Sequence, residues 1–182
     1  MAYFKNRGLR GSNLENLINL TNDVYREKNL AIIQKIPTPI TPVKIDNSTK
    51  TISLAYFNEK STVDYIGVIQ GIAVCFDAKE TSKPYLPLQN IHEHQIAFMR
   101  DFEAQDGVAF LLVHFKLYDE YYYLPFKELI LHYNSAQNGG RKSISYNDFK
   151  KYYSIPQSNK FYVHYLEALS TYLENLGELE NN

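Results

Sequence analysis

Residues 64–79 read DYIGVIQGIAVCFDAK, and we build the predicted fold outward from this stretch. Two runs of β-branched and aromatic residues flank Gln70-Gly71, a pair that suits a tight turn, so the stretch predicts a β-hairpin. Side chains alternate between the two faces of a strand. In the second arm one face is therefore apolar and suits a core, and the other carries Asp77 beside Lys79. Asp64 lies on the first arm, where strand pairing can bring it near Asp77.

The segments around this hairpin alternate between helical and strand patterns. Residues 12–27 have apolar positions at helical spacing behind a capping residue, Ser12 or Asn13, and so predict an amphipathic helix. The nearly continuous apolar run at 108–116 predicts a buried central strand. By the same criteria we expect strands at 30–36 and 121–124, a hairpin within 38–60 that turns at 47–50, and helices at 90–105, 125–136 and 161–175.

This order of elements predicts an α/β fold with a mixed central sheet and helices on its faces. We expect a single domain over residues 1–182, from which the hairpin at about 38–60 projects as a stalk. The acidic end, at about 176–182, is expected to be flexible.

Composition narrows the class of protein. The chain has 182 residues, of which 45% are apolar, and this is enough for a core that is stable alone. The longest apolar run is too short to cross a bilayer, and the N-terminus shows no secretory signal, so we expect no membrane association. The single cysteine, Cys75, excludes an intramolecular disulfide and fits the reducing cytoplasm. Its apolar neighbours favour a packing role.

Charge is distributed unevenly along the chain. The formal net charge is only −1, but residues 1–60 hold 9 Lys and Arg against 5 Asp and Glu. The rest of the chain is acidic, apart from Arg141-Lys142. This uneven distribution fits a surface that faces DNA, and it also fits a mixed, solvated surface. Charge alone therefore does not show whether the protein binds DNA.

The face that carries Asp77 and Lys79 has the groups that hydrolysis of a phosphodiester needs. Carboxylates hold a hard divalent cation, which polarises the phosphoryl oxygen and lowers the pKa of a bound water. The lysine can orient that water or stabilise the charge that develops on phosphorus. Glu15, at the edge of the first helix, could supply a third carboxylate. The spacing alone is also that of a surface ion pair.

Several segments, in the same order, resemble the RecU family of Holliday junction resolvases across most of the chain. They are RG at 10–11 with LE at 14–15 and TN at 21–22, KIPTP at 35–39, AYF at 55–57 with STVDY at 61–65, FDAKET at 76–81, PLQN at 87–90 with HQ at 94–95, and GGRKSI at 139–144. The family usually has glutamate at the position of Asp77. Aspartate keeps the charge and the type of ligand but is one methylene shorter.

The resemblance implies a restriction-endonuclease-like fold, a homodimer and an enzyme that nicks four-way DNA junctions symmetrically with Mg²⁺ or Mn²⁺ during recombination and repair. It implies partners as well, a recombinase and a branch-migration motor. The catalytic residues carried over are Asp64 and Asp77 as metal ligands, Lys79 next to the attacking water, Glu15 as an accessory ligand, and Gln95 and Thr62 at the border of the site. The residues carried over for DNA contact are Arg7, Arg10, Lys35, Thr38, Lys44, Lys50, Arg141, Lys142 and Ser143.

Two other functions remain open at this level. The chain could be a non-catalytic junction-binding protein of the same fold that modulates a recombinase, or a nuclease with another DNA substrate. The histidines and tyrosines are weaker candidates for a functional role. His92 and His94 are two apart and would point in different directions on a helix, which makes them a poor metal pair. The tyrosines at 121–123 favour packing in a strand over stacking on bases.

Overall fold

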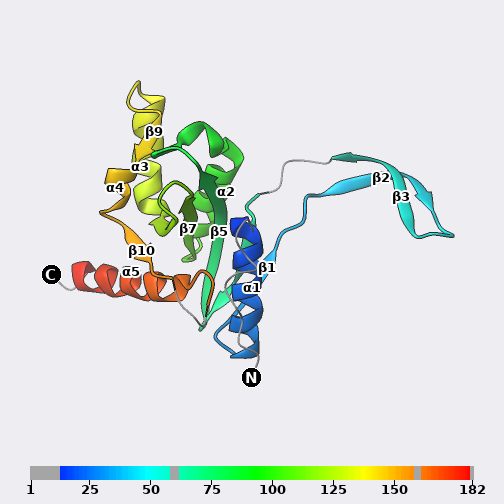
Figure 1. Cartoon of the computed structure of the whole chain (residues 1–182), viewed down its shortest axis with the longest axis horizontal. Helices are drawn as coiled ribbons and strands as arrows, with labels where there is room; N and C mark the ends of the chain where they lie inside the picture. The colour runs from blue at the N-terminus through cyan, green and yellow to red at the C-terminus, as the bar shows by residue number, and fades with distance from the viewer. Residues whose placement is uncertain (1–12, 58–61, 158–160, 181–182) are drawn as a thin grey trace.

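The computed structural model describes residues 13–57, 62–157 and 161–180 (Figure 1). Its elements are α1 (Leu14–Glu27), β1 (Ala31–Lys35), β2 (Ile40–Asp46), β3 (Thr51–Phe57), β4 (Tyr65–Ile69), β5 (Ile72–Thr81), β6 (Tyr85–Pro87), the 3₁₀ helix η2 (Leu88–Asn90), α2 (Glu93–Glu103), β7 (Val108–Phe115), β8 (Glu120–Pro125), α3 (Phe126–Gln137), β9 (Ser143–Ser145), α4 (Tyr146–Phe149), β10 (Tyr153–Ile155) and α5 (Tyr165–Glu180).

A six-stranded mixed sheet, ordered β1-β4-β5-β7-β8-β10, forms the centre of the molecule. β5 and β7 run parallel, whereas the other neighbouring strands in this sheet are antiparallel. β7 is buried along almost its whole length, with only Val108 half-exposed, because strands cover both of its edges and helices both of its faces. The mixed sheet and its buried central strand are therefore confirmed.

Each face of the sheet carries its own apolar cluster. Phe76 and Phe110, stacked with ring centroids 4.7 Å apart, point toward the side covered by α1 and α5. Cys75 and Leu111 point to the opposite side, where α2 and α3 pack. The alternation expected for the second arm of the hairpin is thus confirmed. Cys75 is a buried free thiol and packs in the core.

The first helix begins at Leu14, two residues after the predicted start, and one of the two predicted capping residues caps it. The Asn13 side chain caps it by accepting a hydrogen bond of 3.0 Å from the Asn16 N–H. Its buried residues include the whole expected stripe, which is Leu14, Leu17, Ile18, Thr21 and Tyr25. Thr21 Oγ1 donates to the Leu17 carbonyl and accepts from the Val163 N–H at 3.1 Å, and this contact holds the chain before α5 against α1.

β2 and β3 form a separate two-stranded sheet that projects away from the body (Figure 1). The turn between them lies at 47–50, and Lys50 takes a positive φ of 53° there. Almost every residue of the two strands is exposed, including Tyr56 and Phe57. The projecting hairpin predicted for about 38–60 is confirmed for its described part.

The differences from the prediction concern short or terminal elements. The sequence does not indicate β6, β9 and β10, each three residues long, or the four-residue α4, and the helix expected at 90–105 is the shorter α2. α5 begins at Tyr165 instead of 161, and it extends to Glu180, so most of the end expected to be flexible is helical.

Within the described ranges, no helix is both long and apolar enough to cross a membrane.

Candidate active site

The β4–β5 hairpin places two aspartates side by side. Its turn has Gln70 at φ 50° and Gly71 at φ 90°, and its register pairs Tyr65 with Phe76. Asp64, just before β4, therefore lies opposite Asp77. The Asp64 N–H donates to Asp77 Oδ1 at 3.2 Å, and the Ala78 N–H donates to Asp64 Oδ2 at 2.9 Å. The proximity expected from strand pairing is confirmed, and each carboxylate is fixed by the backbone of the other strand.

Asp77 is fully buried, with a relative exposure of 0%, and its two oxygens have different surroundings. Oδ1 accepts a second hydrogen bond, 2.8 Å long, from Gln95 Nε2 on α2. Oδ2 forms an ion pair with the Lys79 ammonium and accepts no aligned hydrogen bond. A buried carboxylate is costly unless its charge is paired, and Lys79 supplies that pairing here.

Gln95 is itself oriented by the start of α2. Its Oε1 accepts the His92 N–H at 3.1 Å in a capping box, which leaves Nε2 free to point at Asp77. His92 is the N-cap and so lies outside the helix. The expectation that His92 and His94 point apart is therefore wrong: their rings stack with centroids 5.3 Å apart.

The electrostatics of the pair favour binding of a cation. Burial, and then the neighbouring Asp77 carboxylate, raises the pKa of Asp64 to about 6. A cation placed between the two carboxylates would relieve this repulsion and favour the deprotonated form. The buried Oδ2 of Asp77, without an aligned donor, is an oxygen that such a cation could use. Two carboxylates with waters are a usual ligand set for Mg²⁺.

Glu15 is engaged elsewhere in this structure. Its carboxylate pairs with Lys35, and its main-chain carbonyl accepts a hydrogen bond of 3.2 Å from the Tyr65 hydroxyl. Across the described part of the chain, no group of three or more His, Cys, Asp or Glu side chains could hold a metal. The pair Asp64 and Asp77 is thus brought together, whereas a ligand role for Glu15 stays a prediction. Thr62 is half-buried two residues before Asp64.

The residues predicted to contact DNA are spread over several elements. Arg7 and Arg10 lie outside the described residues. The others are exposed or half-exposed: Lys35 at the end of β1, Thr38 after it, Lys44 and Lys50 on the stalk, Arg141 and Lys142 just before β9, and Ser143 as its first residue. The Lys142 carbonyl accepts the Leu88 N–H at 3.0 Å, which holds the 139–143 segment beside the chain that leads into α2.

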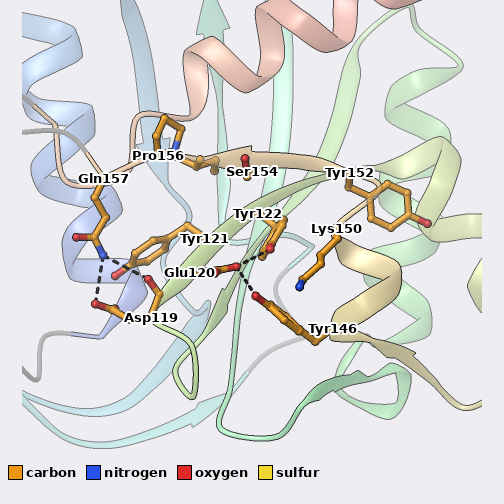
Figure 2. A pocket seen from close by; sticks show the side chains of 11 residues that line it. Asp119, Glu120, Tyr121, Tyr122, Tyr146, Lys150, Tyr152, Ser154, Pro156 and Gln157 are labelled. Atoms are coloured by element: carbon orange, nitrogen blue, oxygen red, sulfur yellow. Dashed lines mark hydrogen bonds between the residues drawn. The ribbon is translucent and has the colours of Figure 1, made fainter.

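A separate cleft lies along β8 and β10 (Figure 2). Glu120 Oε2 accepts hydrogen bonds there from Tyr122, at 2.6 Å, and from Tyr146, at 2.7 Å. None of the predicted catalytic residues lines this cleft. The tyrosines at 121–123 are buried, as the packing interpretation predicted.

A mixed sheet that carries two adjacent carboxylates, one of them fully buried, and a lysine on its central hairpin has the groups that metal-dependent hydrolysis of a phosphodiester needs. The chain matches the family described as RecU, Recombination protein U, over residues 9–171, and it belongs to that family. The resemblance found in the sequence is therefore confirmed.

Two relatives are both named Holliday junction resolvase RecU. The one from Leuconostoc citreum is 44% identical over 175 residues, covering 93% of this chain and 84% of the relative. The one from Bacillus cytotoxicus is 43% identical over 152 residues, covering 81% and 76%. Among solved structures, the Holliday junction resolvase Hjc of Archaeoglobus fulgidus matches with a TM-score of 0.34 and 9% identity, over 62% of this chain and 74% of that one. This last likeness is too distant to bear on function.

Proposed function

We propose that this protein is a Holliday junction resolvase, an endonuclease that hydrolyses phosphodiester bonds in four-way DNA junctions during homologous recombination and repair. Membership of the RecU family and the names of its relatives support the substrate. The observation that carries the chemistry is Asp77, fully buried and held by Gln95, by the Asp64 N–H and by Lys79. An apolar residue can often pack in such a place at lower cost than a buried ion pair, so the retained charge supports a functional role for Asp77.

The metal is proposed to be Mg²⁺, with Mn²⁺ as a substitute, held by Asp64 and Asp77. When bound, it would polarise the scissile phosphate and lower the pKa of the attacking water. Lys79 pairs with Asp77 and would present its ammonium to the negative charge that develops on the phosphate. Gln95 keeps the Asp77 carboxylate in one orientation, so that little reorganisation is needed during the reaction.

The assembly is proposed to be a homodimer. A four-way junction has four strands in two pairs of like polarity, and two identical sites related by a two-fold axis match the two strands of one pair. Association with a recombinase and a branch-migration motor, and a cytoplasmic location, stay predictions.

A nicking assay on a synthetic four-way junction tests the enzyme. Each strand is labelled in turn, and purified protein is added with Mg²⁺ or Mn²⁺. We expect symmetric nicks from the wild type and none from Asp77→Asn, while junction binding in Ca²⁺ persists in both. Asp101→Asn, an exposed position on α2, is the matched control and is expected to nick like the wild type. Binding without nicks by the wild type would refute the enzyme and favour a non-catalytic junction-binding protein.

A further inference from the structure

Glu80 directly follows Lys79 on β5, and its carboxylate is bound by three other parts of the chain. Because side chains alternate along a strand, Glu80 faces α1 while Lys79 faces α2. Glu80 Oε1 accepts the Leu14 N–H at 3.0 Å. Oε2 forms an ion pair of 3.0 Å with Lys116, and Oε1 lies 3.4 Å from His114 Nδ1. One carboxylate therefore joins the catalytic strand to α1, to β7 and to the turn after β7.

Glu80 provides a hydrogen-bond acceptor for the Leu14 N–H at the beginning of α1. The first N–H groups of a helix have no partner within the helix, and their partial positive charge favours an anion. Asn13 accepts one of them, from Asn16, and Glu80 accepts another, from Leu14. Burial raises the pKa of Glu80, but the hydrogen bonds from Lys116, Leu14 and His114 together bring it below its ordinary value, so the carboxylate is ionised.

His114 extends this network away from α1. Its ring is buried and stacks on Tyr121 with centroids 4.2 Å apart, and its Nε2 lies 3.3 Å from Asp119 Oδ1. Asp119 in turn accepts a hydrogen bond of 3.2 Å from Gln157, as Figure 2 shows. Glu80 thus sits in a framework that several packed elements hold in place, and this makes it a fixed anchor for the helix.

The start of α1 bears on the proposed active site. Glu15, its second residue, is a predicted accessory ligand, and the Glu15 main-chain carbonyl accepts a hydrogen bond of 3.2 Å from Tyr65, the residue after Asp64. Glu80 therefore holds this turn of the helix one residue beyond Lys79. We propose that Glu80 is a positioning residue: it holds the first turn of α1 on the catalytic strand, so that Lys79 and Asp77 keep their register with Glu15 and with the scissile phosphate. This inference rests on the proposed nuclease function.

Asn13→Ala is the matched control for Glu80→Ala. Each substitution removes one acceptor from the first turn of α1, but only Glu80 connects that turn to β5. For Glu80→Ala we expect amide exchange at Leu14 to accelerate about tenfold, as for a lost hydrogen bond. Its single-turnover nicking rate at saturating junction should fall about tenfold or more, because a small misplacement is costly in rate. Its affinity for the junction should stay within about twofold of the wild type.

Two further variants separate positioning from stability. Glu80→Gln keeps an oxygen for the Leu14 N–H and is expected to restore nicking to within about threefold of the wild type. Asn13→Ala is expected to nick at the wild-type rate although it loses similar thermal stability. Glu80→Asp keeps the charge but is too short for the contact, and it replaces Glu80→Ala if that variant does not fold.

Three results would overturn the positioning role: wild-type nicking by Glu80→Ala or Glu80→Asp, equal slowing by Asn13→Ala, or no rescue by Glu80→Gln. Each leaves the proposed nuclease intact, because the wild type still nicks. Failure of the wild type itself would instead remove the proposed function, and the positioning role with it.

Discussion

Asp64→Asn should make the metal-free protein more stable, although it removes a proposed metal ligand. Burial and the Asp77 carboxylate raise the pKa of Asp64 from 3.8 to about 6, so ionised Asp64 is unfavourable in the folded state. Asparagine has nearly the same shape, carries no charge and can still accept the Ala78 N–H that Asp64 Oδ2 accepts at 2.9 Å. The substitution therefore removes the repulsion and keeps the hydrogen bond.

Proton linkage determines how the difference in stability between the variant and the wild type changes with pH. Because the folded state binds the Asp64 proton more tightly than the unfolded state, this group lowers the stability of the wild type as pH rises from about 4 to about 6. The raised pKa corresponds to an upper bound of about 3 kcal/mol, at about 1.4 kcal/mol per pH unit. Since the carboxyl is still partly in contact with solvent, screening reduces this to about 1–2 kcal/mol. The variant should match the wild type near pH 4 and exceed it by that amount above pH 6.

Urea unfolding in the presence of a chelator measures this difference. The chain has 16 tyrosines and no tryptophan, so far-UV circular dichroism is a suitable probe. Asp101→Asn on the exposed face of α2 serves as the control and should show no pH-dependent gain. Millimolar Mg²⁺ should stabilise the wild type and leave Asp64→Asn almost unchanged, since only the wild type keeps both carboxylates. A difference that is independent of pH, or that favours the wild type as pH rises, would refute the assignment of a strained carboxylate pair.

Three further substitutions test the site and the framework that holds it. Lys79→Met should lower the single-turnover nicking rate about 100-fold or more, since a charge opposite the developing phosphate charge is lost; a change below about threefold in that assay would contradict the proposed role. Thr21→Val removes the acceptor for the buried Val163 N–H and should cost about 1–3 kcal/mol of unfolding free energy in urea. An unchanged midpoint would show that this contact is dispensable. Gly67→Ala would place a Cβ 2.1 Å from the Ile32 carbonyl oxygen, so it should destabilise the protein by about 1–3 kcal/mol and speed amide exchange along β1 and β4. Wild-type exchange in those strands would contradict the close approach.

The elements that the sequence predicts well are those whose partners are near in the chain. The β4–β5 hairpin closes through the two-residue turn Gln70-Gly71, and the buried stripe of α1 repeats at helical spacing, so each carries its own local signal. β6 and β9 have no such signal. Each is three residues long, and Tyr85 pairs with Ser145 across 60 positions of sequence. Their pairing is decided by tertiary contacts that a local pattern does not contain.

In the site, too, local contacts are predictable and long-range contacts are not. The hairpin register predicts that Asp64 lies near Asp77, whereas only the family resemblance indicates Gln95, because Gln95 lies on a separate helix. The sequence does not predict the contacts of Glu80, since its partner Leu14 is 66 residues away and a glutamate next to a catalytic lysine has no distinctive spacing. The prediction for His92 and His94 is wrong because it assumes a helix from residue 90, whereas α2 begins at Glu93 and His92 lies outside it.

The position of Asp77 shows why this site is built on a strand that has core on its other face. Phe76 is stacked between Tyr65 and Phe110, with centroid distances of 4.7 Å to each, so the backbone of β5 has little freedom to shift. A carboxylate on the neighbouring residue cannot move toward solvent when its charge is unfavourable, and it must be satisfied in place by Gln95 and Lys79. This arrangement keeps a negatively charged oxygen of Asp77 in a fixed position, where a divalent cation could bind it. We therefore expect substitutions of the Phe76 stack to reduce the nicking rate more than junction affinity, because they loosen the carboxylate without removing a DNA contact.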